Sequence, residues 1–248
     1  MHVLEFKDFS ALYRVDKKQF GIAVDNINLS VDSGEFLVIV GPSGSGKTTL
    51  LKSVLGSIDF IEGDILLDGT NINNIRKADR NLAYICQDYN LFPQMTVYEN
   101  IAFPLRVMKT PQAEVDKRVK AIAQTLGVID LLTRKPRYLS GGQIQRVEIA
   151  RALVKNPRIV LFDEPFANLD PLIRTDMRLL VKKIHQEQRP TFLFITHDLT
   201  EALMLADRIV VMNDGEIVEV GTPNEIKTKP KSEFVKEFFN VGTTWDDD

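Results

Sequence analysis

Two long segments near the N-terminus alternate apolar and polar residues, while shorter segments further along are apolar throughout. The alternation in Leu4–Tyr13 and Ile22–Val31 predicts two half-buried strands that pair with each other. Phe36–Val40 is an uninterrupted apolar run, as expected for a strand buried in a parallel sheet. The same part of the chain has the patterns of a helix at Lys47–Leu55 and of strands at Ile65–Leu67 and Leu82–Cys86.

The middle of the chain changes character, because three successive segments read as helices with no convincing strand among them. These segments are Val97–Met108, Pro111–Leu126 and Gly142–Leu153. Strands and helices then alternate again: strand Ile159–Phe162, helix Leu172–Gln188, strand Thr191–Ile195, helix Thr200–Leu205 and strand Ile209–Met212. Two short helices are predicted over Pro223–Phe239.

This order of elements predicts an α/β fold with an N-terminal antiparallel β-subdomain. We expect one domain over residues 1–239, with its core drawn from residues 1–89 and 154–220. A helical subdomain is inserted at roughly residues 90–153, since helices alone occupy that stretch. Helices at residues 221–239 and an acidic tail at residues 240–248 complete the predicted organisation.

Composition narrows the classes of protein to consider. Of the 248 residues, 44% are apolar and 26% charged, which is ordinary for a globular protein. The net charge is −3, whereas nucleic-acid-binding proteins usually have an excess of basic residues. No nucleic-acid partner is therefore expected. Cys86 is the single cysteine and excludes an internal disulfide. Apolar runs as short as Phe36–Val40 cannot span a bilayer, so we expect any membrane role to be peripheral.

A Gly-rich segment between the buried strand and the next helix has the residue types of a phosphate cradle. Residues 41–48, GPSGSGKT, match the pattern G-x-x-x-x-G-K-[ST]. Glycines allow the backbone N–H groups to point inward at phosphate oxygens. Lys47 would place its charge on the β- and γ-phosphates, and the Thr48 hydroxyl can ligate Mg²⁺. The alternative is a simple Gly/Ser turn, which the full motif in this context disfavours.

Two acidic residues end the apolar strand Ile159–Phe162. Ligands bind at this end of the strands of a parallel sheet. Asp163 would therefore hold Mg²⁺, and Glu164 would polarise the attacking water. A solvated acidic turn is the alternative, and the Gly-rich loop argues against it.

A second Gly-rich turn, LSGGQ at residues 139–143, opens a later helix. As bare chemistry it forms another anion-binding helix N-terminus, although an ordinary N-cap by Ser140 would look the same. One nucleotide does not need two cradles in one chain. The second cradle makes sense if it closes over a nucleotide that is held elsewhere.

Together, GPSGSGKTT, LSGGQ and IVLFDEP resemble the motifs of the ATP-binding subunits of ABC (ATP-binding cassette) transporters, and the resemblance extends over almost the whole chain. It implies a P-loop NTPase core, ATP and Mg²⁺ as cofactors, and ATP hydrolysis. It also implies that two copies pair head to tail. ATP would then lie between residues 41–49 of one copy and residues 140–143 of the other.

Smaller motifs of the family follow in order. Gln87 resembles the Q-loop glutamine that links the metal site to the membrane partner, and His197 resembles the switch histidine at the γ-phosphate. Taken alone, His197 would more readily be read as a capping or core histidine, because a single histidine says little. The nucleotide-binding set implied by the resemblance is Tyr13, Gly41, Pro42, Ser43, Gly44, Ser45, Gly46, Lys47, Thr48, Thr49, Ser140, Gly141, Gly142, Gln143 and the D-loop Asp170. The catalytic set is Glu164, His197 and Gln87, and the Mg²⁺ set is Thr48, Gln87 and Asp163.

Some positions remain open or depart from the pattern. Tyr13 resembles the aromatic residue that stacks on adenine, with Phe20 as the alternative and a core role for Tyr13 as a third reading. The departures are Ala167 where serine is usual, Ile144 and Glu148 where glutamine and alanine are usual, and Cys86 where phenylalanine is frequent. None removes a group expected to touch phosphate or metal, so hydrolysis should survive.

The segments around Gln87 and His197 resemble the importer branch that serves polyamines, ferric iron, molybdate or sulfate, phosphonates and sugars. The resemblance implies solute import at the cytoplasmic face of the membrane, with permease subunits on other chains and an extracytoplasmic solute-binding protein as an indirect partner. Longer members carry a C-terminal β-domain, which we expect to be missing because the sequence ends soon after Phe239.

Two other classes of P-loop protein fit the sequence less well. Soluble ABC proteins that act on ribosomes or DNA usually carry two cassettes or a long insertion, whereas this chain has one Gly-rich loop. A P-loop GTPase or kinase has no use for LSGGQ, and the guanine-reading motif N-K-x-D is absent from the sequence.

Large apolar residues are unusually dense after Gln87, at Leu91, Phe92, Met95, Val97, Tyr98 and Phe103. Some must pack inside the helical subdomain. We expect the others to form an exposed patch, and such patches usually mark interfaces.

Overall fold

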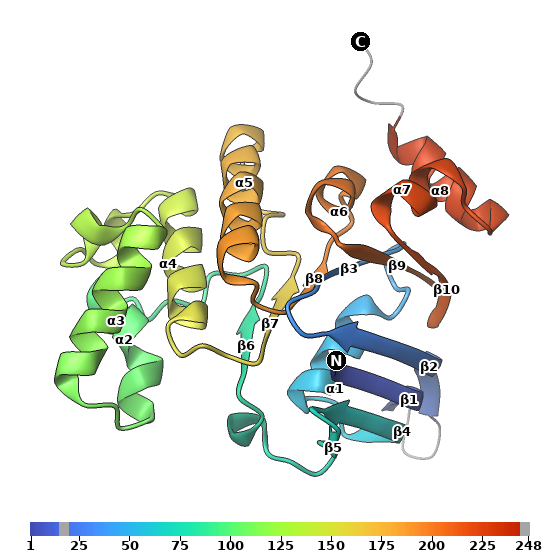
Figure 1. Ribbon diagram of the computed structural model, residues 1–248, viewed down its shortest axis with the longest axis horizontal. Helices are drawn as coiled ribbons and strands as arrows, with labels where there is room; N and C mark the ends of the chain where they lie inside the picture. The colour runs from blue at the N-terminus through green and yellow to red at the C-terminus, as the bar shows by residue number, and fades with distance from the viewer. Residues whose placement is uncertain (15–19, 244–248) are drawn as a thin grey trace.

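The strands form two sheets in the computed structural model, which describes residues 1–14 and 20–243 (Figure 1). The first sheet is antiparallel, with the order β2–β1–β4–β5. Its strands are β1 (His2–Arg14), β2 (Phe20–Asp32), β4 (Phe60–Leu67) and β5 (Thr70–Asn71). The predicted pairing of the first two strands is confirmed, with Phe6 opposite Leu29 and Tyr13 opposite Gly21.

The second sheet has the order β10–β9–β3–β8–β7–β6. Its strands are β3 (Phe36–Val40), β6 (Leu82–Ile85), β7 (Ile159–Asp163), β8 (Phe192–Ile195), β9 (Arg208–Asn213) and β10 (Glu216–Gly221). All neighbours pair in parallel except β9 and β10. Because β8 lies between β3 and β7, the loops that follow these three strands meet at one edge of the sheet.

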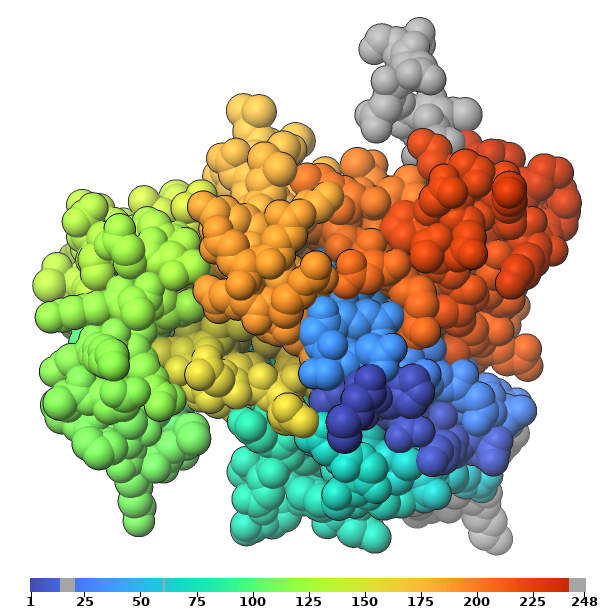
Figure 2. All heavy atoms as spheres, in the orientation of Figure 1, coloured from blue at the N-terminus to red at the C-terminus, as the bar shows by residue number. Residues whose placement is uncertain are grey.

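The helices divide into three groups (Figure 1). α1 (Lys47–Leu55) follows β3 and packs against strands of both sheets. α2 (Val97–Val107), α3 (Gln112–Thr125) and α4 (Gly141–Leu153) form a lobe at one end of the molecule, coloured green to yellow in Figure 2. α5 (Pro171–Gln188) and α6 (Leu199–Leu205) lie over the six-stranded sheet, and α7 (Pro223–Thr228) and α8 (Glu233–Thr243) lie at the other end.

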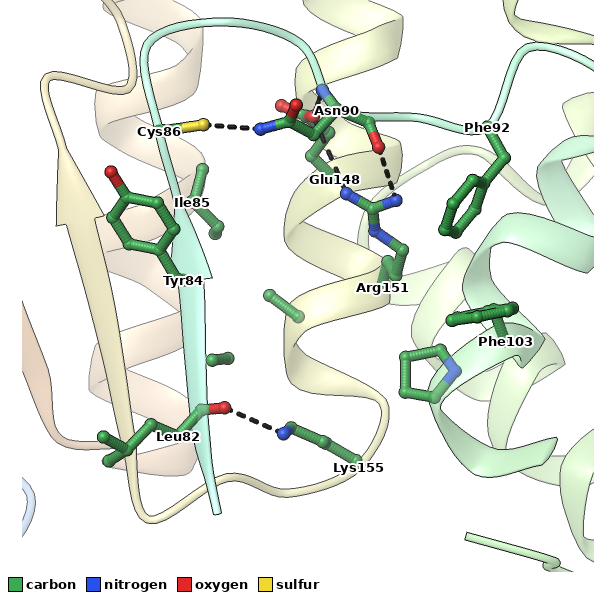
Figure 3. A pocket seen from close by; sticks show the side chains of 13 residues that line it. Leu82, Tyr84, Ile85, Cys86, Asn90, Phe92, Phe103, Glu148, Arg151 and Lys155 are labelled. Atoms are coloured by element: carbon green, nitrogen blue, oxygen red, sulfur yellow. Dashed lines mark hydrogen bonds and ion pairs between the residues drawn. The ribbon is translucent and has the colours of Figure 1, made fainter. Parts of the chain in front are cut away.

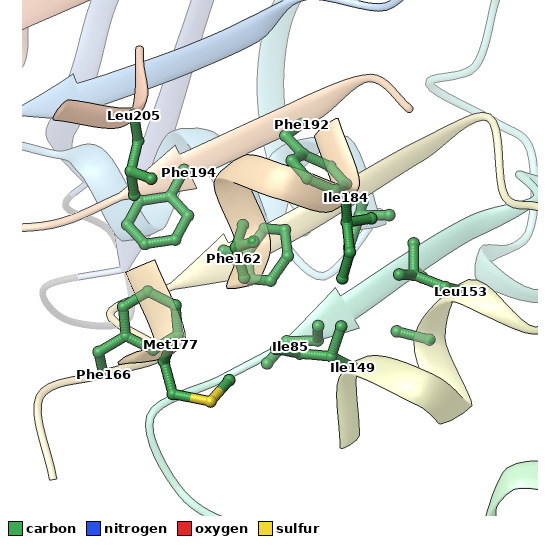
Figure 4. Close-up of a cluster of buried hydrophobic side chains, with 14 of the residues drawn as sticks. Ile85, Ile149, Leu153, Phe162, Phe166, Met177, Ile184, Phe192, Phe194 and Leu205 are labelled. Atoms are coloured by element: carbon green, nitrogen blue, oxygen red, sulfur yellow. The ribbon is translucent and has the colours of Figure 1, made fainter. Parts of the chain in front are cut away.

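Both faces of the six-stranded sheet are covered, which explains why its strands are apolar throughout. Along β3, Phe36, Val38 and Val40 face the cluster under α5, whereas Leu37 and Ile39 face α1 and the antiparallel sheet. The cluster under α5 holds interlocking aromatic rings (Figure 4). Phe162 and Phe192 contact edge to face at 5.1 Å between ring centroids. This packing holds rigid the strand that ends in Asp163.

Several boundaries differ from the sequence-based predictions. β10 was not predicted, although Asp214 and Gly215 both adopt the positive φ of a hairpin turn, at 47° and 86°, and this dipeptide is a strong hairpin signal. β4 begins at Phe60 rather than near Ile65. The earlier start was not predicted, because Gly63 and acidic residues interrupt the apolar pattern in the first half of the strand. α8 continues to Thr243, so the predicted acidic tail begins inside a helix.

No helix in the described part of the chain combines the length and the apolar character needed to cross a membrane.

Candidate nucleotide-binding site

The loop between β3 and α1 leaves a helix N-terminus open. Gly46 is the N-cap of α1, with a left-handed φ of 94°, and no side chain caps the helix. By contrast, other helices are capped by a hydrogen bond to the side chain of their own N-cap residue. These N-cap residues are Thr96, Ser140, Asp170, Asp198 and Thr222. The first N–H groups of a helix have no intrahelical partner. At α1 they are therefore free to bind an anion, which the helix dipole also favours.

Two glycines allow this loop to lie against its surroundings. A Cβ atom at Gly41 would come within 2.1 Å of the Met212 carbonyl oxygen, and one at Gly46 within 2.6 Å of the Ala23 carbonyl oxygen. Larger residues at these positions would push the loop away from β9 and β2. At Gly44, by contrast, a Cβ atom would meet nothing within 4 Å, so this glycine faces open space.

Lys47 is almost fully buried and is held by the loop itself. Its Nζ donates to the carbonyl oxygens of Gly41 at 2.8 Å and Pro42 at 2.7 Å, and to Ser45 Oγ at 3.3 Å. Burial lowers the pKa of Lys47, and the nearby carboxylates oppose this shift. An ammonium has three donors, and the loop occupies all three. A phosphate group must therefore displace at least one loop oxygen to reach this charge.

Asp163 receives one hydroxyl hydrogen bond on each carboxylate oxygen. Thr48 Oγ1 donates to Oδ1 at 3.0 Å, and Tyr84 OH donates to Oδ2 at 3.1 Å. Burial, together with the charge of Asp163, raises the pKa of Tyr84. The link between Thr48 and Asp163 joins the start of α1 to the end of β7. Tyr84 was not among the residues predicted from sequence, since a tyrosine in a strand carries no functional signal by itself.

Glu164 and His197 come together at the same edge of the sheet. The backbone of Glu164 has a positive φ of 50°, and its N–H donates to the Ile195 carbonyl at 3.0 Å. His197 Nδ1 lies 2.9 Å from Glu164 Oε2. Two of the three predicted catalytic residues therefore contact each other, although they follow different strands.

A cavity of about 530 Å³ lies over the loop. Predicted residues that line it are Tyr13, Ser43, Gly44, Gly46, Lys47, Thr48, Thr49 and Glu164. Residues missed by the sequence analysis are Ile22, Ala23, Asp214 and Gly215. Asp214 and Gly215 form the turn of the β9–β10 hairpin. They were not predicted as lining residues because β10 itself was not predicted. Gly41, Pro42 and Ser45 contribute by holding Lys47 instead.

The exposed Tyr13 ring lies across the backbone of Gly21, where a Cβ atom would approach it to 2.4 Å. Tyr13 therefore stands at the rim of the cavity with 55% of its surface accessible, and is not a core residue. The side chain of the alternative, Phe20, lies outside the described part of the structure.

Other predicted residues do not line this cavity. Asp170 caps α5 by accepting from the Ile173 N–H at 3.1 Å, and Ser140 and Gln143 form a capping box on α4. Gly142 packs tightly against α5, where a Cβ atom would lie 2.6 Å from Ile173 Cγ2. Gln87 is exposed, and its carbonyl accepts from Asn168 Nδ2 at 3.1 Å. The contact of these residues with a nucleotide remains a prediction.

The oxygen ligands at the site fit Mg²⁺ bound together with a phosphate. Mg²⁺ takes hard oxygen ligands and is usually held by one or two carboxylates plus substrate phosphates rather than by a full protein cage. Thr48 and Asp163 supply a hydroxyl and a carboxylate at the mouth of the anion-binding loop. Across residues 1–14 and 20–243, no three His, Cys, Asp or Glu side chains form a cluster that could hold a metal alone.

Comparison with known proteins agrees with this geometry. A sequence model of the family described as ABC transporter matches residues 24–167, which is more than half of the chain. This chain belongs to the ABC transporter family. The match begins in β2 and ends after Glu164, so it contains the loop, the helical lobe and both acidic residues.

Named relatives of this ABC protein include import proteins. The oligosaccharides import ATP-binding protein MsmX of Bacillus subtilis (strain 168) is 46% identical over 87% of the chain. The sn-glycerol-3-phosphate import ATP-binding protein UgpC of Bordetella avium (strain 197N) is also 46% identical over 87% of the chain. The alignments cover 59% and 60% of these relatives, so the chain spans about three fifths of their length.

Solved structures show the same fold. cbiO1 from Clostridium perfringens, part of the ABC transporter complex cbiONQ, has a TM-score of 0.82 at 29% identity, with 91% of this chain and 90% of that chain covered. The ATP-binding cassette MJ0796, solved as a dimer bound to ADP and Pi in a post-hydrolysis state, has a TM-score of 0.76 at 32% identity, with 89% and 98% covered. The predicted P-loop NTPase fold of the ABC type is thereby confirmed.

This ABC protein has a second concave surface between β6 and the helical lobe, which we call the β6 groove (Figure 3). Its volume is about 490 Å³. The residues that line it are Leu82, Ala83, Tyr84, Ile85, Cys86, Asn90, Phe92, Phe103, Pro104, Glu148, Arg151, Ala152 and Lys155. Phe92 and Phe103 are partly exposed and pack ring against ring at 4.7 Å between centroids. Of the other apolar residues after Gln87, Val97 is fully buried, and Leu91 and Tyr98 pack partly against the core.

Glu148 lies at the base of the β6 groove and is 4% exposed. One carboxylate oxygen accepts the Asn90 N–H, whereas the other has no hydrogen-bond partner among the described residues. Arg151 Nη2 lies 3.9 Å from the Glu148 oxygen that accepts the Asn90 N–H. Burial raises the pKa of Glu148 to about 7, although the Asn90 hydrogen bond and Arg151 lower it in part.

We predict that this carboxylate makes stability depend on pH. Between about pH 4.5, the ordinary value, and about pH 7, the folded protein binds a proton at Glu148 that the unfolded chain has released. The free energy of unfolding therefore falls as pH rises through this window, and above the window Glu148 adds no further pH dependence. Glu148→Gln should become more stable relative to wild type by roughly 2–3 kcal/mol across the window.

Urea unfolding at intervals from pH 5 to pH 8 measures this difference. Glu187→Gln serves as a control, because that carboxylate is half exposed on α5. If the wild-type and Glu148→Gln stabilities change in parallel with pH, Glu148 does not titrate in this range.

Proposed function

We propose that this chain binds and hydrolyses ATP and thereby energises solute import by a membrane transporter whose permease lies on other chains. The observation that carries the proposal is the meeting of three groups at one sheet edge. They are the uncapped start of α1 with Lys47, the Thr48–Asp163 pair, and the Glu164–His197 pair. The import role is supported by relatives that are named as import proteins.

Binding begins with the phosphate chain. The open N–H groups of α1 receive phosphate oxygens, and Lys47 exchanges loop carbonyls for the β- and γ-phosphates. The hydrogen bonds that Lys47 makes to Gly41, Pro42 and Ser45 keep its charge in place beforehand. Tyr13 at the cavity rim stacks on the adenine ring, which has a π-face that any aromatic residue can cover.

Hydrolysis needs a metal ion, a general base for the attacking water and a hydrogen-bond donor to the γ-phosphate. Mg²⁺, when bound, neutralises charge on the β- and γ-phosphates, and Thr48 and Asp163 would hold it. Glu164 accepts the proton of the attacking water. His197 contacts the Glu164 carboxylate; it would thereby orient the base, and it would donate to the γ-phosphate. Gln87 would join the metal site when the loop after β6 rearranges.

A second copy completes the site. Ser140 and Gly141 open α4, a second helix N-terminus, away from the cavity over the loop. A head-to-tail pair would place them over the nucleotide of the partner copy. The dimeric MJ0796 cassette supports such self-association.

We predict that Glu164→Gln abolishes turnover but keeps ATP binding. The amide preserves the shape of the side chain yet cannot accept a proton, and loss of a general base lowers the rate by about 100-fold or more. ATP-bound dimers should accumulate, which light scattering detects. Glu187→Gln is the control on the same protein. Hydrolysis by Glu164→Gln within threefold of wild type would show that Glu164 is not the base.

The permease would dock in the β6 groove. Its exposed aromatic pair, Phe92 and Phe103, matches the apolar patch expected after Gln87. A short cytoplasmic helix of a permease would fit a groove of this kind. Because the groove runs beside the start of the Gln87 loop, an occupant there can influence the metal site.

We predict that Phe103→Asp releases the chain from membranes, because the partner would have to bury an unpaired charge. The membrane-bound fraction of the tagged protein in its own cells should fall about tenfold or more. Hydrolysis by the isolated chain should persist, since no phosphate ligand changes. Val107→Asp is the matched control, because Val107 lies on the same helix, is 66% exposed and is outside the groove. Equal membrane binding by both variants would place the docking surface elsewhere.

A further inference from the structure

Tyr84 reaches the metal carboxylate from the edge strand of the sheet. β6 pairs in parallel with β7, and Tyr84 is in register with Leu161, two residues before Asp163. Ala83 and Ile85 of β6 face the cluster under α5, whereas Leu82 and Tyr84 face the α1 side. Figure 3 shows the Tyr84 ring on the side of β6 away from Glu148 and Arg151. Alternation along one short strand therefore points this phenol toward Asp163.

The two oxygens of Asp163 have different partners. Oδ1 accepts from Thr48, the residue that would itself ligate Mg²⁺. Oδ2 accepts from Tyr84 at 3.1 Å, and no other donor to it is found among the described residues. The terminal torsion of an aspartate is soft, so a carboxylate held at one oxygen alone can rotate. The phenol of Tyr84 holds the second oxygen and fixes the plane of the group.

We propose that Tyr84 is a positioning residue for the Mg²⁺ site, because its hydroxyl holds Asp163 in the orientation in which it meets the metal. The proposal rests on the proposed role of Asp163 as the metal carboxylate. Hydrogen-bond partners behind a metal ligand typically change metal affinity by about 10–100-fold when removed. Tyr84 is also half buried against the core, so packing alone is the competing explanation. Packing would be served equally well by phenylalanine.

The test is a Mg²⁺ titration of nucleotide binding with Tyr84→Phe, which removes one oxygen atom and keeps the ring. A fluorescent ATP analogue reports nucleotide affinity, first in EDTA and then at increasing Mg²⁺. Affinity in EDTA should equal that of wild type, because no phosphate ligand is altered. The Mg²⁺ concentration at the midpoint of the titration, called the Mg²⁺ midpoint below, should rise about tenfold or more. Thermal unfolding without nucleotide confirms that the variant is folded.

Tyr98→Phe is the matched control, because Tyr98 OH also donates to a carboxylate, that of Asp116, but in the helical lobe. Its Mg²⁺ midpoint should stay at the wild-type value. Asp163→Asn runs beside both variants, and its midpoint should rise as well.

The outcomes are distinct. A shift in Tyr84→Phe and Asp163→Asn, with none in Tyr98→Phe, supports the proposal. Wild-type behaviour of Tyr84→Phe while Asp163→Asn shifts overturns it and leaves the role of Asp163 intact, since Tyr84 then only fills space. Equal shifts in Tyr84→Phe and Tyr98→Phe also overturn it. Wild-type behaviour of Asp163→Asn removes Asp163 from the metal site and contradicts the proposed function itself.

Discussion

Parallel pairing of β3, β8 and β7 is the constraint on which the site depends. Each strand leads into a loop with predicted site residues: Gly41 follows β3, Glu164 follows β7, and His197 comes soon after β8. Register fixes their relative heights, with Ile39 and Asp163 both in register with Ile195 of β8. The sheet can hold this alignment because both of its faces are buried. Slippage of one strand would separate the phosphate loop from the acids.

Within this frame, the chain treats its two Gly-rich helix starts differently. α1 begins at an uncapped glycine beside the buried charge of Lys47, so its N–H groups are available to phosphate. α4 begins with a capping box between Ser140 and Gln143 and lies against α5 instead of the cavity. One chain thus contains an uncapped helix N-terminus beside a buried lysine and, apart from it, a second Gly-rich helix N-terminus that is capped by its own side chains.

Much of this site could be predicted from the sequence. The Gly-rich loop and the acidic strand end are local sequence patterns. The structure has the loop between β3 and α1 and Asp163 at the end of β7, as predicted. The β9–β10 hairpin was not predicted, because its turn signal lies in the Asp214–Gly215 pair and in neither residue alone. The same two residues are therefore among the lining residues that the prediction missed. Tyr84 could not be found, because its role depends on register between β6 and β7, which lie 70 or more residues apart. The burial of Glu148 likewise depends on how α4 packs on the loop at Asn90.

The sharing of each nucleotide between two copies is tested most directly by mixing two inactive variants. One chain carries Lys47→Ala and loses the charge at its Gly-rich loop, while the other carries Gly141→Asp and has an altered LSGGQ turn. Each variant alone should be inactive. Heterodimers, isolated through two different affinity tags, contain one intact composite site and should regain ATP hydrolysis. If isolated heterodimers form but hydrolyse no more ATP than either parent, the LSGGQ turn does not serve the nucleotide of the partner copy.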